Sequence, residues 1–192
     1  MKAITPILLS LTLLAPLCGT AAEQKIDLAR VISTATGDWN KDGMMDRAFL
    51  IAPAGNDDSD VALHIYLGEQ GSSLPKLEIV KPNLVWSGAM WGTTPSLTIG
   101  KSGSLEVHSQ NEAIGRNRWS QKLTLAYRKG AFVVAGYTYN SYDTLDLSAG
   151  LSCDVNLLTG GGIKDKKSFK IAGKMTKLTD WSEDQVPAQC QE

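Results

Sequence analysis

Short strand-like runs separated by turn residues follow one another along most of this chain, and no long helical stripe of apolar residues interrupts them after the first 22 residues. In the run 61–67 every second residue is apolar, which is the period of a strand with one buried face. The runs 119–127 and 131–139 have the same character and are separated by a turn at Arg128-Lys129-Gly130. The pattern predicts an all-β chain, either an antiparallel β-sandwich or a partial propeller-like arrangement. Further strands are expected over 76–80, 95–99, 104–108, 154–158 and 168–171.

The N-terminal segment has the composition of a secretory signal peptide. Lys2 precedes an apolar stretch over 7–17, and small residues follow at 20–22. The apolar stretch is too short to span a membrane, so we expect cleavage after Ala22 and a periplasmic or secreted protein. Residues 23–192 then form one all-β domain of about 170 residues, which is long enough for an adequate core. Lipidation at Cys18 is the alternative for this segment.

The net charge bears on the kind of partner, and the cysteine content bears on disulfide formation. The formal net charge is −1 and no long basic run occurs, so nucleic acid is not an expected partner and a monomer is the simplest state. Cys153 and Cys190 remain after cleavage. In an oxidising compartment such a pair predicts a disulfide, and two separate buried thiols are the alternative.

One nine-residue segment, 38–46, follows the pattern D-x-N-x-D-G-x-x-D. Calcium takes about six to eight hard oxygen ligands, and Gly43 permits the sharp turn that aims alternate side chains inward. The pattern predicts a calcium site, and an Asx-turn without an ion is the alternative. The predicted ligands are Asp38, Asn40, Asp42, the backbone carbonyl of Met44, and Asp46.

This segment resembles the calcium loop of FG-GAP repeats, which occur in integrin-type propellers and in exported bacterial proteins. It differs from an EF-hand because Phe49 occupies the position of the bidentate glutamate and because strands, rather than helices, are expected on both sides. Without that glutamate we expect a Kd of about 0.1 to 1 mM, as in extracellular modules. A full propeller should repeat the loop, and the chain has one copy.

Sequence motifs of catalysis are missing. The chain has no G-x-S-x-G, no H-E-x-x-H and no phosphate loop, and its two histidines, His64 and His108, lie in expected strands opposite the apolar face. We therefore expect a protein without enzymatic activity. A pair of carboxylates for glycoside hydrolysis remains formally open among Glu106, Glu112, Asp143, Asp146 and Asp154.

Two segments combine aromatic side chains with small residues, a composition typical of contact surfaces: 86–93 and 136–143. Trp86 is expected in the core, whereas Trp91 and Tyr142 fit packing and contact equally well. Tyr137 and Tyr139 fit a row of aromatic side chains on a sheet.

The signal peptide, the single calcium loop, the all-β pattern and the late cysteine pair together resemble small exported bacterial proteins, some similar to periplasmic inhibitors of lysozyme and peptidoglycan hydrolases. In such inhibitors a Ser-Gly loop with a nearby aromatic residue enters the cleft of the hydrolase. The resemblance implies that Ser87, Gly88 and Trp91 contact a cell-wall hydrolase. The alternative is a module that binds carbohydrate or peptidoglycan, and an envelope scaffold is a third possibility.

Overall fold

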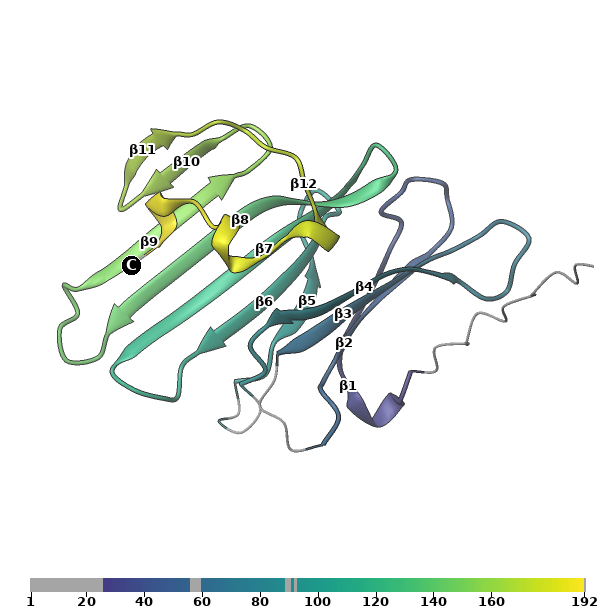
Figure 1. Cartoon of the computed structure of the whole chain (residues 1–192), viewed down its shortest axis with the longest axis horizontal. Helices are drawn as coiled ribbons and strands as arrows, with labels where there is room; N and C mark the ends of the chain where they lie inside the picture. The colour runs from purple at the N-terminus through teal and green to yellow at the C-terminus, as the bar shows by residue number, and fades with distance from the viewer. Residues whose placement is uncertain (1–25, 56–59, 89–90, 92, 192) are drawn as a thin grey trace, which may run out of the picture.

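The computed structural model describes residues 26–55, 60–88, 91 and 93–191. The predicted signal peptide lies outside these residues. The described chain forms two antiparallel sheets, one of four strands and one of eight, which confirms the all-β prediction (Figure 1). Sheet A has the order β1-β2-β3-β4, and sheet B has the order β11-β10-β9-β8-β7-β6-β5 with β12 paired to β8. Among the described residues, no helix is long and apolar enough to cross a membrane.

The strands and 3-10 helices have the following bounds. Sheet A contains β1 (Val31–Gly37), β2 (Asp46–Ile51), β3 (Val61–Leu67) and β4 (Lys76–Val85). Sheet B contains β5 (Ser96–Ile99), β6 (Leu105–Asn111), β7 (Asn117–Arg128), β8 (Ala131–Asp143), β9 (Gly150–Asn156), β10 (Gly161–Lys164), β11 (Lys167–Lys170) and β12 (Thr176–Lys177). The 3-10 helices are η1 (Leu28–Arg30), η3 (Leu178–Asp180), η4 (Glu183–Gln185) and η5 (Ala188–Cys190).

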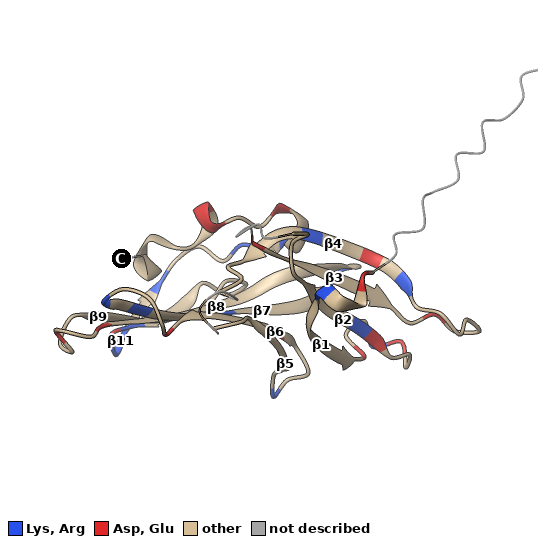
Figure 2. Cartoon of the chain, turned by 90° about the horizontal axis from the view of Figure 1, so that it is seen from below, with Lys and Arg blue, Asp and Glu red and all other residues tan. Residues whose placement is uncertain are grey.

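Sheet A lies over one face of sheet B, and the C-terminal segment lies on the same side (Figure 2). Because side chains alternate along a strand, every second side chain points into the core between the sheets. Leu63 and Ile65 of β3 and Leu123 and Leu125 of β7 are buried in this way. Phe132 of β8 is among the largest fully buried side chains. Burial of these apolar faces is the main force that holds the two sheets together.

The glycines at 160–162 are a local correction to the expected strands. They lie between the expected strands 154–158 and 168–171, but Gly161 and Gly162 begin β10, which pairs with both β9 and β11. A Cβ atom on Gly162 would collide with the ring of Phe169 in β11, so the glycine allows this ring to cover the strand.

The C-terminal segment, residues 178–191, is fixed to both sheets. Cys190 is joined to Cys153 of β9 with a Cα–Cα distance of 5.3 Å, which confirms the predicted pair. Lys81 of β4 donates hydrogen bonds through Nζ to the carbonyl oxygens of Trp181 at 2.6 Å and Thr179 at 3.2 Å. The segment therefore has one covalent attachment to sheet B and a polar attachment to sheet A.

Candidate functional site

The predicted calcium loop connects β1 to β2. These strands pair up to Gly37 and Asp46, so the residues between them form the connection of a hairpin. The turn requires left-handed backbone at Lys41 (φ 63°) and Gly43 (φ 87°). The glycine in the motif is thus needed where the pattern places it.

The polar side chains of the loop fold inward onto its backbone. Asp38 accepts hydrogen bonds from the N–H groups of Asp42 at 3.1 Å and Gly43 at 3.0 Å, one on each carboxylate oxygen. Asn40 Oδ1 also accepts from the N–H of Asp42 at 3.1 Å, and its Nδ2 donates to Asp42 Oδ2 at 2.7 Å. The other oxygen of Asp42 accepts from the N–H of Met44 at 2.7 Å. These bonds order the loop without an ion, as an Asx-turn would.

Asp46 lies at the base of the loop and is completely buried. Its Oδ2 accepts a hydrogen bond from the N–H of Trp39 at 2.8 Å, and its Oδ1 accepts from the N–H of Gly68 at 3.0 Å. Gly68 follows β3 and was not singled out by the sequence, because its contact with the loop depends on the pairing of β2 with β3. The buried charge of Asp46 is thus stabilised by two backbone donors from different segments.

The donor chemistry of the loop fits calcium. Its predicted ligands are oxygen atoms only, and a carboxylate oxygen that accepts one hydrogen bond keeps a further lone pair. Within the described residues, no three His, Cys, Asp or Glu side chains are grouped so that they could hold a metal by themselves. A bound ion would therefore also require Asn40, the Met44 carbonyl and water. The calcium site stays a prediction.

The second predicted site contains Ser87, Gly88 and Trp91, which follow β4. The carbonyl of Gly88 accepts hydrogen bonds from the N–H groups of Trp91 at 3.0 Å and Thr93 at 3.1 Å. Gly88 has φ +56°, and a Cβ atom there would lie 2.5 Å from the carbonyl oxygen of Thr93. Trp91 is 50% exposed, whereas Ser87 is half-buried. Residues 89, 90 and 92 lie outside the described part of the loop.

An aromatic row begins at the base of this loop and runs across sheet B. Trp86 lies 5.7 Å from Trp119, and Trp119 lies 6.5 Å from Tyr139, measured between ring centroids. Tyr139 stacks on Tyr137 at 6.4 Å with an interplanar angle of 6°, and Tyr137 lies 6.5 Å from Trp181. Trp86, which the sequence placed in the core, is half-buried at one end of the row.

The aromatic row lines an open groove of about 410 Å³. The opposite wall comes from the C-terminal segment and includes Glu183, Asp184 and Val186. Both carboxylates are exposed, while Tyr137 is only 5% exposed and its burial raises the pKa of its phenol. The groove therefore combines aromatic faces with acceptor groups along one rim. The sequence did not predict this wall, because it approaches the row only in the folded chain.

The five candidate carboxylates for glycosidase chemistry have separate local partners. Glu106 contacts Lys122, Glu112 accepts from the hydroxyl of Tyr142, and Asp154 accepts from Thr138. Hydrogen bonds from Arg116 to Asp143 and from Ser148 to Asp146 lower the pKa of these two carboxyl groups. A general acid in a glycosidase needs a raised pKa, so neither Asp143 nor Asp146 has the property that this role demands.

The two histidines differ in their surroundings. His108 is partly exposed and its Nε2 lies 2.9 Å from Thr98 Oγ1. His64 faces away from the sandwich core, as expected, but is only 8% exposed, and its Nδ1 has no hydrogen-bond partner among the described residues. Burial, together with the charge of Arg30, lowers the pKa of His64.

No protein-family model, curated protein or solved structure matches the chain.

Proposed function

We propose that this chain is an exported, non-catalytic calcium-binding protein that binds a cell-wall hydrolase and inhibits it. The observation that carries the proposal is the half-exposed Trp91, whose backbone N–H donates to the carbonyl of Gly88. An exposed tryptophan is a favourable contact group, because it adds a large apolar surface at little entropic cost. Calcium at 38–46 has a structural role in this proposal.

The test is the lysis of peptidoglycan by a panel of lysozymes and other peptidoglycan hydrolases, with and without the mature protein and calcium. We expect slower lysis by at least one hydrolase, and we expect Trp91→Ala to abolish the effect. Leu145→Ala is the matched control, because Leu145 is 79% exposed on the loop between β8 and β9. Unchanged lysis across the panel would contradict inhibition.

A second function, glycan binding, is favoured by the aromatic groove. Aromatic rings stack on the apolar faces of sugars, and carboxylates such as Glu183 and Asp184 accept hydrogen bonds from sugar hydroxyls. Sedimentation of the protein with insoluble peptidoglycan tests this function. Retention that is lost in Trp119→Leu but kept in Trp91→Ala would assign binding to the groove. If the unbound fraction is the same with and without peptidoglycan, the groove does not bind this glycan.

A further inference from the structure

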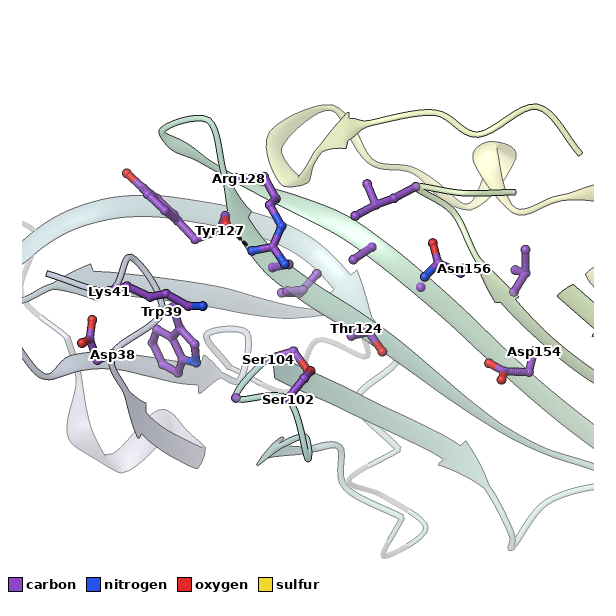
Figure 3. Close-up of a pocket in the computed structure, with 17 residues that line it drawn as sticks. Asp38, Trp39, Lys41, Ser102, Ser104, Thr124, Tyr127, Arg128, Asp154 and Asn156 are labelled. Atoms are coloured by element: carbon purple, nitrogen blue, oxygen red, sulfur yellow. Dashed lines mark hydrogen bonds between the residues drawn. The ribbon is translucent and has the colours of Figure 1, made fainter. Parts of the chain in front are cut away.

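A second hollow, of about 400 Å³, lies apart from the aromatic groove. Three parts of the chain enclose it: the predicted calcium loop, the turn between β5 and β6, and the strands β7, β8 and β9 (Figure 3). We call it the loop-side pocket. It shares no lining residue with the groove, so its ligand can be tested separately.

Two cationic side chains reach the loop-side pocket from different elements. Lys41 comes from the calcium loop, and Figure 3 shows its amine directed toward the pocket. Arg128 comes from the end of β7, and its Nη1 donates to the carbonyl of Tyr127 at 2.8 Å, which orients the guanidinium. Among the described residues, Lys41 makes no ion pair or side-chain hydrogen bond. An anionic group between the two cations would have a charged partner on each side.

A buried donor without a partner lies beside these cations. Trp39 is 5% exposed, lines the pocket, and its Nε1 has no hydrogen-bond partner among the described residues. The indole is held in place by edge contact with Phe132 at 6.1 Å, so it does not turn freely toward another acceptor. A buried N–H group without an acceptor costs about 1 to 3 kcal/mol. Nε1 has almost no accessible surface, so a ligand oxygen accepts from it only when the loop shifts to uncover it.

The remainder of the pocket suits a small polar molecule. Its floor includes Ala126, Ala135 and Gly136, whose short side chains allow a ligand to approach the sheet closely. Hydroxyl groups of Ser102, Ser104 and Thr124 line the sides. Figure 3 shows Asp154 at the end of the pocket away from Lys41. Asp38 lies near Lys41, but both of its carboxylate oxygens accept hydrogen bonds from backbone N–H groups of the loop.

We propose that the loop-side pocket binds a small hydroxylated ligand through an anionic carboxylate or phosphate group. The anion accepts hydrogen bonds from Lys41 and Arg128 and, once the loop shifts to uncover it, from the indole N–H of Trp39. The hydroxylated part lies over the alanine and glycine floor. The sequence pattern gave no indication of this site, because its three donors come from segments about ninety residues apart in the chain.

The test follows the indole N–H signals of the mature protein by NMR during titration with glucuronate, inorganic phosphate and neutral glucose. Trp39→Phe identifies the Trp39 signal among those of the five tryptophans. We expect a saturable shift of this signal with glucuronate, with phosphate or with both, and none with glucose. A response to glucuronate alone assigns a carboxylate ligand, and a response to phosphate alone assigns a phosphate ligand.

Three exposed residues supply the variants. Lys41→Gln and Arg128→Gln should each weaken binding about tenfold or more, because each removes a charged hydrogen-bond donor. Lys129→Gln should leave binding unchanged, since Lys129 does not line the pocket. The proposal is overturned if neither anion shifts the Trp39 signal, if glucose shifts it equally, or if Lys41→Gln and Arg128→Gln bind like the original protein. If Trp39→Phe does not fold, these two surface variants still decide the matter through calorimetry with the same three compounds.

Discussion

The backbone N–H of Gly68 donates a hydrogen bond of 3.0 Å to Oδ1 of the buried Asp46, across 22 residues of sequence. This contact joins the end of β3 to the base of the predicted calcium loop. A Cβ atom on Gly68 would lie 2.8 Å from both the carbonyl oxygen of Met45 and the Cβ of Met44. The close approach of the two segments therefore requires glycine at this position.

Gly68→Ala should lower the free energy of unfolding by about 1 to 3 kcal/mol, because the methyl group would push the loop away from β3 and lengthen the hydrogen bond to Asp46. Denaturant unfolding measures the change. Gly161→Ala is the control, since the nearest atom to a Cβ there is 3.8 Å away. If the two variants have the same free energy of unfolding, the loop accommodates the added methyl group at position 68 without loss of stability, which would contradict this prediction.

Calcium should stabilise the metal-free protein. With a Kd of about 0.1 to 1 mM, calcium at about 10 mM adds roughly 1.4 to 2.7 kcal/mol to the free energy of unfolding. Calorimetry should give about one equivalent, and thermal melting should show a rise in Tm that Asp42→Ala removes. Glu69→Gln, a carboxylate outside the loop with a 52% exposed side chain, should keep the full response. If calcium produces neither heat nor a Tm shift in the unmodified protein, the loop does not bind calcium and is only a turn.

His64 should make the fold sensitive to mild acid. Burial and Arg30 lower its pKa in the folded state, so between that value and about 6.5 the unfolded chain binds more protons than the folded chain. Stability contributed by neutral His64 is therefore complete above about pH 6.5 and falls as the pH decreases toward the folded pKa, by at most about 1.4 kcal/mol per pH unit. Unfolding of the original protein and of His64→Gln at a series of pH values isolates this contribution. His108→Gln should retain the loss, and a His64→Gln variant that loses as much stability as the original would refute the assignment.

Reduction of the Cys153–Cys190 disulfide should release the C-terminal segment, which forms one wall of the aromatic groove. The bond closes a loop with a sequence separation of 37, and its loss should cost about 3 to 4 kcal/mol. Denaturant unfolding with and without reductant measures this cost. A Cys153→Ser, Cys190→Ser double variant should unfold like the reduced protein and should not respond to reductant. The same stability with and without reductant in the original chain would show that the segment is held by other contacts, such as those from Lys81.

The strands were largely predictable because their signal is local. Alternation over 61–67 and 131–139 depends on neighbouring residues only, and the structure forms β3 and β8 there. The chemical character of the predicted calcium loop is also local, since the glycine and the polar side chains occur within nine residues. Metal binding itself depends on how those oxygen atoms converge, which the spacing does not determine.

The missed features depend on contacts between distant segments. Nothing in the sequence marks Gly68 as a partner of Asp46, because the contact forms only when the strands pair. The strand that begins at Gly161 was not predicted, because the sequence does not show that the ring of Phe169 covers Gly162. His64 was expected opposite the apolar face of its strand, yet it is buried, and its Nδ1 has no hydrogen-bond partner among the described residues. A periodic pattern predicts which side chains of a strand share a face, but it does not predict which other segments cover that face.

The attachment of residues 178–191 has a consequence for the order of assembly. β7, β8 and β9 are consecutive antiparallel strands and can pair as soon as they are synthesised, whereas the hydrogen bond from Lys81 to Trp181 spans 100 residues. A partly made chain can thus hold a formed sheet whose tryptophan and tyrosine rings are still uncovered. Such an exposed aromatic surface can bind another incomplete chain or a chaperone. Docking of the C-terminal segment covers it, and the same aromatic rings then form one side of the groove.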